Sequence, residues 1–303
     1  MKVLIVCSIN QGRIAPFISD QVENLRNEGV EIEFYTISER GLSGYWKSRK
    51  GLLLKINDFQ PNLIHAHYGL SGLMANLQRK VPVVTTYHGS DINNVKILYL
   101  SKISMLLSRY NIFVSQRNID KAHPKRNYSL ISCGVDTELF KLLDKSTCRQ
   151  LSGFSETEKL ALFSSIFDNR VKNPRLAQDA VKLLPDVKLI ELKGCTREQV
   201  CQLLNTVDVT LMTSFTEGSP QIIKEAMACG CPIVSVDVGD VKEIIGNTEG
   251  CFICLPDKEE VAMALSKAIE YGKRTEGRYR ILNFDNRIVA GKILAIYRKI
   301  LAG

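Results

Sequence analysis

Two hydrophobic patterns alternate along the whole chain. Short apolar runs of strand length are separated by stretches in which apolar residues return every three or four positions, as on the buried face of a helix. The strand-like runs are residues 1–7, 30–37, 63–68, 81–88, 111–115 and 128–132 in the first half and 160–167, 187–194, 207–214, 231–238 and 251–255 in the second. Strands that alternate with helices form parallel, doubly wound sheets, so the pattern predicts an α/β protein.

A chain of 303 residues fits two domains of this kind. A polar stretch near residues 138–158 interrupts the pattern, so we place the domains at 1–150 and 151–284. The apolar residues of the last stretch, 285–303, fall on one face of a helix: Val289, Ile293, Ile296 and Ile300. We expect this C-terminal helix to pack back toward the first domain.

Chemically active residues gather just beyond the ends of the predicted strands. Open parallel sheets bind ligands at the carboxyl ends of their strands, where loops and helix N-termini meet. The residues at these positions are Asn10, Gly12, His65, His67, His88, Gly89, Asp91, Gly134, Asp136, Arg170, Lys172, Glu217 and Gly218. Each has a structural explanation when taken alone, such as a glycine in a turn. Together they indicate a binding site at the strand ends.

The segment TEGSPQIIKE, residues 216–225, places two carboxylates at a predicted helix start. Ser219 can cap the helix and Pro220 suits its first position, which leaves Glu217 in the preceding loop. The positive end of the helix favours a phosphate group. Because a carboxylate repels phosphate, we expect Glu217 to meet hydroxyl groups or a developing cation instead.

Glu225 lies in the second turn of the same helix. Its carboxylate could accept hydrogen bonds from two neighbouring sugar hydroxyls. It could equally pair with Lys224 or with a distant arginine, and the spacing leaves both readings open.

Longer segments of the chain resemble one enzyme family. Residues 216–245, TEGSPQIIKEAMACGCPIVSVDVGDVKEII, resemble the Glu-x7-Glu segment of the retaining glycosyltransferases of family 4, which have the GT-B fold. ISCGVDTELF is similar to the family's Asn-Gly-Val-Asp segment, and HAHYG, HGSD and AIYRKIL follow in the family's order. The resemblance covers nearly the whole chain and implies two Rossmann-like parallel-sheet domains that face a central cleft.

The resemblance also implies roles for individual residues. The domain at 151–284 would bind a nucleotide-sugar donor, and the domain at 1–150 would hold the acceptor. The donor-binding residues would be Arg170 and Lys172 on the diphosphate, Gly218, Ser219 and Pro220 beside the donor sugar, and Glu225 on the ribose. Here the chain departs from the family pattern, because its arginine stands within two residues of the lysine.

Two residues would act on the reacting sugar. Glu217 matches the family glutamate at the donor sugar, and His88 matches the histidine that faces this sugar from the first domain. Gly12, with Asn10 beside it, matches the loop that approaches the diphosphate or the acceptor.

The reaction that the resemblance implies is sugar transfer from a nucleotide diphosphate to a hydroxyl acceptor with retention of anomeric configuration, as in the synthesis of bacterial polysaccharides or glycolipids. The leaving phosphate would take the acceptor's proton, so no separate base is needed. No cofactor and no metal are expected, and the chain has no Asp-x-Asp pair at a strand end. The alternatives are an epimerase or glycan phosphorylase of the same fold, or a non-catalytic subunit of a glycan assembly.

The charge distribution adds a further partner. Residues 41–126 carry thirteen Lys and Arg against three acidic residues, a surplus that indicates anionic company or a basic surface kept for solubility. YWKSRKGLLLK (45–55) and VKILYLSKISMLLSRY (95–110) combine apolar and basic residues, as in segments that dock on anionic lipid. They also fit a surface loop and a core helix. We expect peripheral contact with an anionic membrane, where a glycan or lipid-linked acceptor would lie, and no nucleic-acid partner.

Localisation follows from the remaining patterns. The start MKVLIVCSIN lacks the pattern of a signal peptide, and no apolar run approaches the ~18 residues of a membrane span. Nine cysteines, an odd number set mostly in apolar runs, suit buried thiols in a reducing compartment. We therefore expect a cytoplasmic protein associated with the cytoplasmic face of a membrane.

Overall fold

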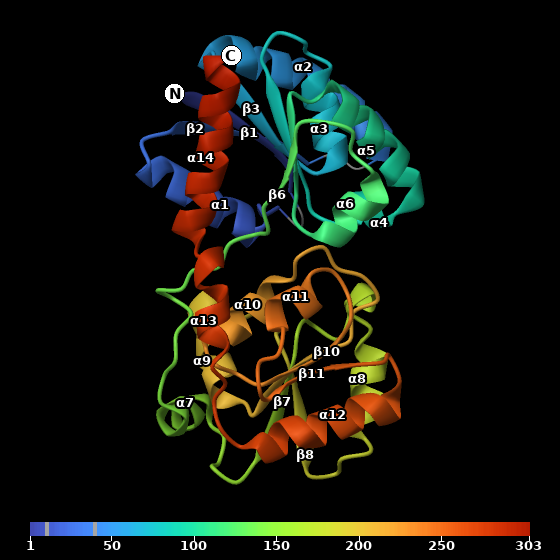
Figure 1. Cartoon of the computed structure of the whole chain (residues 1–303), viewed down its shortest axis with the longest axis vertical. Coiled ribbons are helices and arrows are strands. Elements are labelled where there is room, and N and C mark those ends of the chain that lie inside the picture. The colour runs from blue at the N-terminus through green and yellow to red at the C-terminus, as the bar shows by residue number, and fades with distance from the viewer. Residues whose placement is uncertain (10–11, 39–40) are drawn as a thin grey trace. The chain divides into compact units, whose positions relative to one another are not determined.

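The computed structural model describes residues 1–9, 12–38 and 41–303. By their contacts these residues form two compact units, Met1–Gly134 with Asn286–Gly303, and Val135–Asp285 (Figure 1). All eleven strand-like runs of the sequence form strands, which pair in parallel within two sheets. The predicted α/β class is confirmed.

The first unit is built on a six-stranded sheet in the order β2-β1-β3-β4-β5-β6. Its strands are β1 (Lys2–Ser8), β2 (Glu31–Ile37), β3 (Leu63–His67), β4 (Val83–Tyr87), β5 (Tyr110–Phe113) and β6 (Tyr128–Leu130). Its helices are α1 (Pro16–Asn27), α2 (Gly41–Phe59), α3 (Gly69–Asn76), α4 (Ser90–Asn93), α5 (Val95–Leu107), α6 (Gln116–Ala122) and α14 (Asn286–Ala302).

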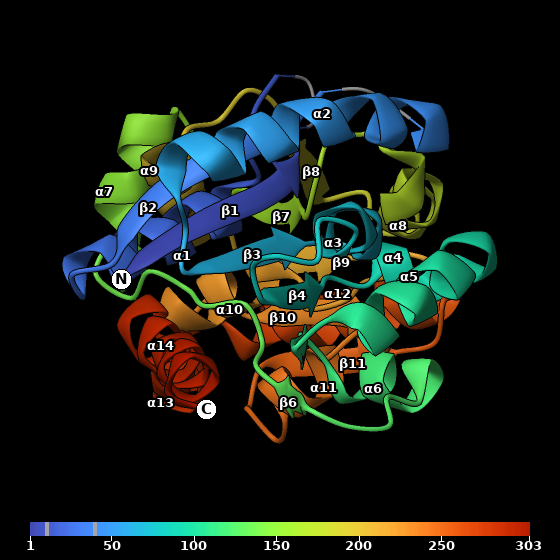
Figure 2. The same ribbon diagram turned by 90° about the horizontal axis from the view of Figure 1, so that it is seen from above.

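Helices cover both faces of this sheet. Val3 and Ile5 of β1 share an apolar cluster with α1 and α14, whereas Leu4 and Val6 share another with α2 and α3. Figure 2 shows α2 and α14 on opposite sides of β1 and β3. Because β1 is buried on both faces, its continuous apolar sequence is that of a central parallel strand.

The second unit contains a five-stranded sheet in the order β11-β10-β9-β7-β8. Its strands are β7 (Lys159–Phe163), β8 (Val187–Glu191), β9 (Val209–Met212), β10 (Ile233–Val236) and β11 (Cys251–Cys254). Its α-helices are α7 (Lys145–Ser152), α8 (Pro174–Val181), α9 (Arg197–Thr206), α10 (Gln221–Ala228), α11 (Val241–Ile245), α12 (Lys258–Tyr271) and α13 (Gly277–Ile281). Two 3-10 helices, η1 (Arg170–Lys172) and η2 (Leu282–Phe284), complete it.

The second unit begins at Val135, earlier than the boundary at residue 150 expected from the sequence. The polar stretch contains α7, which belongs to this unit because Arg149 is 1% exposed and donates hydrogen bonds to Thr206 O and to the carboxylate of Asp208. The C-terminal helix α14 groups with the first unit, where it packs beside α1. No helix in the described residues is both long enough and apolar enough to cross a bilayer.

Helices α3 and α5 of the first unit approach each other closely through glycine. A Cβ atom on Gly69 would lie 2.0 Å from Ser101 Oγ and 2.7 Å from Ser101 Cβ. Ser101 is itself fully buried and donates a hydrogen bond of 2.9 Å to Asp91 O. The contact therefore has no space for a larger side chain at either position.

We predict that Gly69→Ala destabilises the first unit. The added methyl group must push α3 from α5, and overpacking of this kind costs about 1–3 kcal/mol. Gly291→Ala in α14 is the matched control, because nothing lies within 4 Å of its Cβ position; alanine there should leave the free energy of unfolding unchanged or raise it. Urea unfolding of both variants measures the difference, and equal stabilities would contradict the prediction.

Candidate functional site

Two loops at the carboxyl ends of neighbouring strands form the candidate donor site in the second unit. One loop follows β7 and contains η1, and the other follows β9 and leads into α10. Hydrogen bonds join them, because Phe215 N donates to Val171 O at 3.0 Å, and the side-chain hydroxyl of Thr213 donates to Lys172 O at 3.1 Å and to Asn173 O at 2.9 Å.

The joined loops bring two of the predicted site residues into direct contact. Lys172 Nζ lies 2.5 Å from Glu217 Oε1, with side-chain exposures of 22% and 13%. Arg170 occupies the same 3-10 turn as Lys172 and is exposed to solvent. A cation and a carboxylate therefore lie side by side at the edge of the sheet where ligands of parallel sheets bind.

Three buried polar atoms at the same edge make no hydrogen bond within the described chain. They are Ser164 Oγ just after β7, Ser214 Oγ just after β9, and Gln221 Oε1 at the first residue of α10. Buried polar atoms in native proteins almost always have a partner, and those without one point to a ligand or water at the site.

Ser219 and Pro220 act differently from the helix start that the sequence predicted. Helix α10 begins at Gln221, Pro220 is its N-cap residue, and no side chain caps it. The hydroxyl of Ser219 is otherwise engaged: it donates to Asp240 Oδ2 at 2.6 Å and accepts from Lys224 Nζ at 2.5 Å. Ser219 thus links the loop to the residues after β10, and the predicted serine cap is wrong.

Glu225 lies in α10 and is mostly buried. Arg197 Nη2, at the start of α9, lies 3.9 Å from Glu225 Oε1, the outer limit of an ion pair. Of the two pairing partners considered from the sequence, the arginine is therefore close, whereas Lys224 turns to Ser219. The backbones of Gly218 and Gly239 are in close contact, since a Cβ atom on Gly239 would lie 2.6 Å from Gly218 O.

Three histidines of the first unit stack together: His65 and His67 lie within β3, where the sequence placed them beyond a strand end, and His88 directly follows β4. The rings of His65 and His67 lie 4.5 Å apart, and those of His67 and His88 lie 5.2 Å apart. His67 Nδ1 and His88 Nε2 share a hydrogen bond of 2.9 Å, and Cys133 Sγ lies 3.6 Å from His88 Nδ1. His65 bonds to Tyr297 on α14 at 2.5 Å, so the C-terminal helix helps to hold the stack.

Burial keeps these histidines uncharged. It lowers the pKa of His67 to about 3, and it lowers the pKa of His65 and His88, with the neighbouring imidazoles adding to the effect. His88 is therefore a neutral hydrogen-bonding group near pH 7.

Asp91 organises the loop that carries His88. Its carboxylate accepts hydrogen bonds from the backbone N–H groups of Gly69 at 2.9 Å, His88 at 3.0 Å and Gly89 at 2.9 Å. Burial raises the pKa of Asp91 to about 6, although these N–H donors lower it. Gly89 has a φ of +108°, a conformation that side chains disfavour.

The loop residues predicted near the N-terminus are only partly described. Gly12 has a φ of +77° and open space around its Cβ position, which suits close approach of a ligand to the backbone. Asn10 lies outside the described residues.

Sequence reasoning did not identify Asp240 or Arg197, and it named Lys224 only as a possible partner of Glu225; in the structure these three residues contact Ser219 or Glu225. Asp240 follows the end of β10, so the rule that selected the other strand-end residues could have found it. Lys224 is fully buried, and neither it nor Arg197 stands at a strand end.

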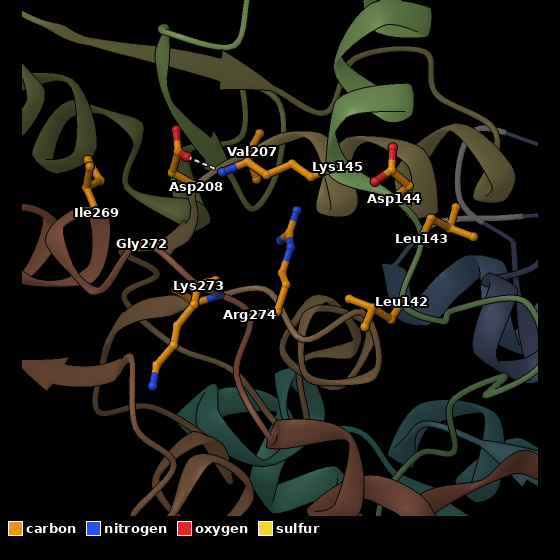
Figure 3. Close-up of a pocket in the computed structure, with 11 residues that line it drawn as sticks. Leu142, Leu143, Asp144, Lys145, Val207, Asp208, Ile269, Gly272, Lys273 and Arg274 are labelled. Atoms are coloured by element: carbon orange, nitrogen blue, oxygen red, sulfur yellow. Dashed lines mark hydrogen bonds and ion pairs between the residues drawn. The ribbon is translucent and has the colours of Figure 1, made fainter.

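A separate cavity of 480 Å³ lies at the amino ends of the same sheet (Figure 3). Its lining includes Val207 and Asp208 before β9, and Pro232 before β10. Two cations of this cavity make structural contacts. Lys145 pairs with Asp208 at 2.5 Å, and Arg274 donates hydrogen bonds to the carbonyl groups of Leu204 and Asn205 near the end of α9. This cavity lies at the opposite strand ends from the candidate donor site.

Comparisons with known proteins identify relatives of both α/β units. The family model for glycosyl transferases group 1 matches residues 168–271, and the model for glycosyltransferase family 4 matches residues 10–139. Among solved structures, a sucrose-phosphate synthase from Thermosynechococcus elongatus superposes with a TM-score of 0.83 at 17% identity, over 100% of both chains. HepE from Anabaena, in complex with UDP, superposes with a TM-score of 0.77 at 18% identity, over 99% of this chain and 100% of that one.

Related sequences extend over a smaller part of the chain. The N-acetyl-alpha-D-glucosaminyl L-malate synthase of Bacillus anthracis is 23% identical over 232 residues, 64% of this chain and 61% of that protein. The amylovoran biosynthesis glycosyltransferase AmsK of Erwinia amylovora is 25% identical over 248 residues, 68% of this chain and 60% of that protein. The chain thus spans about three fifths of the length of these relatives.

Two parallel-sheet units with these structural neighbours define the GT-B fold that the sequence predicted. The chain belongs to the glycosyltransferases, because the group 1 and family 4 models together match residues 10–139 and 168–271.

The buried histidines lead to a prediction about pH. His67 stays neutral in the folded protein down to about pH 3, whereas an unfolded histidine takes up a proton near pH 6.5. Because only the unfolded state takes up this proton, the free energy of unfolding should fall by about 1.4 kcal/mol for each pH unit below pH 6.5. His67→Asn, which keeps a hydrogen-bonding group without the titrating ring, should remove that component.

Urea unfolding between pH 7 and pH 5 measures the slope for both proteins. Asp91 acts in the opposite sense, because its raised pKa favours the folded state at low pH; its contribution cancels in the difference between variants. His123→Asn is the control, since His123 is exposed and its φ of +51° is one that asparagine tolerates. Equal slopes for wild type and His67→Asn would disprove the account.

Proposed function

We propose that the protein transfers a sugar from a nucleotide-diphosphate donor to a hydroxyl acceptor with retention of configuration. The observation that carries the proposal is the contact between Lys172 and Glu217 beside three buried polar atoms without partners. Family membership supports the reaction class, and the complex of HepE with UDP supports a nucleotide donor. The relative AmsK, a biosynthetic glycosyltransferase by name, supports a role in bacterial cell-surface polysaccharide or glycolipid synthesis.

The ion pair suggests how the donor binds. In the proposal, Lys172 leaves Glu217 and pairs with the diphosphate of the donor. The exposed Arg170 contacts the same phosphates. Both cations then offset the negative charge that grows on the leaving group. Glu217, released from the lysine, faces the donor sugar and stabilises the positive charge that develops at its anomeric carbon. Lys172 and Glu217, which pair with each other in the absence of donor, would thus stabilise the negative charge on the diphosphate and the positive charge on the sugar, which develop together in the transition state.

The remaining predicted residues position the donor. Glu225 would accept the ribose hydroxyls, and the backbone at Gly218, Ser219 and Pro220 would follow the sugar. Ser219 is suited to a fixed backbone position because Asp240 and Lys224 both hold its hydroxyl. His88 would contact the donor sugar as a neutral group, and Gly12 with Asn10 would approach the diphosphate or the acceptor.

Proton transfer needs no further base in this scheme. The departing phosphate oxygen takes the acceptor's proton while the acceptor attacks from the same face of the sugar. We propose that neither a metal ion nor a cofactor takes part. The acceptor would be a glycan or a lipid-linked saccharide at the cytoplasmic face of a membrane.

The two glutamates should separate in steady-state kinetics. Glu217→Gln keeps the size of the side chain and removes its charge, so kcat should fall about a hundredfold or more while donor affinity changes little. Glu225→Ala should instead raise the donor KM about tenfold or more, because it removes hydrogen bonds made in both ground and transition states. Rapid-quench measurements with the donor identified by a thermal-shift panel show whether chemistry limits turnover.

A Glu217→Gln enzyme with full kcat under those conditions would refute its proposed role. Donor consumption without an acceptor would favour an epimerase or hydrolase, and phosphate-dependent cleavage of a glycan would favour a phosphorylase.

The phosphate grip can be tested by binding alone. Lys172→Ala should weaken nucleoside diphosphate binding about tenfold or more, since a hydrogen bond to a charged group is worth roughly 1.5–3 kcal/mol, and it should leave free nucleoside binding nearly unchanged. Arg175→Ala, a cation 92% exposed on the following helix, is the control. Calorimetry gives both constants. Unchanged diphosphate affinity in the Arg170→Ala, Lys172→Ala double variant would place the phosphate site elsewhere.

A further inference from the structure

Helix α5 of the first unit exposes a row of apolar residues and buries two serines on the opposite side. Its outward residues are Val95, Tyr99, Ile103 and Leu106, which are 62%, 70%, 46% and 66% exposed. Their spacing of three and four positions places them on one face of the helix. The opposite face, packed against α3, carries the buried serines Ser101 and Ser104, and Met105 beside them is also buried. A helix of a water-soluble surface has the reverse pattern, so the outward face is suited to an apolar partner.

Basic residues surround the C-terminal end of this helix. Two cavities, of 460 Å³ and 560 Å³, share Leu106 and Arg126 in their linings. Within the described part of the chain, none of the residues that line them is acidic. The basic residues that line them are Arg79, Lys80, Lys102, Arg109, Lys125 and Arg126. All of these except Lys102, which is partly buried, are exposed.

We propose that these residues form a docking surface for an anionic lipid bilayer. The docking surface consists of the four apolar residues on the outward face of α5 and the six basic residues of the two cavities. The apolar side chains enter the boundary between headgroups and acyl chains, and the cations contact lipid phosphates from the adjoining cavities. Figures 1 and 2 show α5 on the outer flank of the first unit.

The chemistry of the docking surface favours a bilayer over other partners. A soluble polyanion would engage the cations and gain nothing from four exposed apolar side chains. A second copy of the chain would bring six basic residues against six, and like charges repel. A bilayer with anionic headgroups offers both an apolar layer and negative charge.

The structure separates the two segments that the sequence indicated for membrane contact. In α2, Leu52 and Ile56 are 1% and 5% exposed and belong to the core, and Lys55 pairs with Glu33. Leu54 is 62% exposed, but it is the one exposed residue among 51–56 and forms no apolar row, so we place the docking surface on α5 and the cavities beside it. The docking surface also adjoins the His88 loop, because Asn94 caps α5 only three residues after Asp91, whose carboxylate accepts a hydrogen bond from His88 N.

Vesicle sedimentation of the full chain tests the docking surface without donor or acceptor, so the result does not depend on the proposed transferase activity. The wild type should sediment with vesicles of mixed phosphatidylcholine and phosphatidylglycerol, and not with phosphatidylcholine alone, and salt should weaken the binding. Lys102→Gln, Lys125→Gln and Arg126→Gln together should lower the partition coefficient about a hundredfold, since each basic residue near the surface is worth about fivefold.

An apolar variant tests the other half of the docking surface. Tyr99→Ser, Ile103→Ser and Leu106→Ser together should also abolish sedimentation. Controls in the second unit match both changes: Leu151→Ser, Leu255→Ser and Tyr279→Ser, exposed apolar residues, and Arg175→Gln, Lys182→Gln and Lys188→Gln, exposed cations. Both controls should bind like the wild type, and thermal unfolding should confirm that every variant is folded.

Three results would overturn the proposal. The first is equal sedimentation with neutral and anionic vesicles. The second is wild-type binding by the apolar variant, which would assign the cations to a soluble polyanion such as inorganic polyphosphate. The third is a change from dimer to monomer in the apolar variant without loss of vesicle binding, which would assign the face to a second copy of the chain.

Discussion

The hydrogen bonds between the loop after β7 and the loop after β9 determine the geometry of the candidate donor site. They anchor Val171 and Lys172 by their carbonyl groups, so the lysine side chain leaves the backbone at a fixed place. Glu217 follows from the other loop, and the two charges meet although 45 positions separate them in sequence. A partly buried charge is costly without a partner, and each side chain lowers that cost for the other. In the proposed reaction a diphosphate replaces the carboxylate as the partner of Lys172, so the cation is never left without a counter-charge.

In the first unit the corresponding constraint is burial without charge. The stack of His65, His67 and His88 is held as neutral rings, and Tyr297 from α14 closes its inner end. The buried carboxylate of Asp91 is stabilised by hydrogen bonds that it accepts from the backbone N–H groups of Gly69, His88 and Gly89. The start of α3 and the loop that carries His88 are therefore held by the same side chain. In the proposed reaction, a neutral His88 is suited to hydrogen bonding with a sugar hydroxyl, because that contact involves no change in its own charge.

The sequence predicted the strands well because periodicity is local, and each run was long enough to show it. Candidate site residues could also be selected from the sequence, because the rule that ligands bind at the carboxyl ends of parallel strands requires only that each strand end be recognised. The contact of Lys172 with Glu217 did not, because it depends on β9 lying beside β7, an order that the sequence does not reveal. The serine cap was wrong for a similar reason: Asp240 lies 21 positions later, and it competes for the hydroxyl of Ser219. The boundary expected at residue 150 rested on polar composition, which cannot show that Arg149 is buried against the end of α9.

Helix α5 shows how a core constraint can fix a surface. The sequence of α5 has apolar residues on every side, so its periodicity does not reveal which face is buried. Packing against α3 makes the choice, because Gly69 and Gly72 leave room only for small side chains; a Cβ on Gly72 would lie 2.5 Å from Ser104 Oγ. Serine fits that contact and a leucine or tyrosine does not. Turning the helix to hide its apolar residues would drive one of them into α3, at the cost that overpacked interiors carry. The outward position of Tyr99, Ile103 and Leu106 is therefore a consequence of close packing inside the unit, and the apolar face stays available to whatever the basic residues beside it attract.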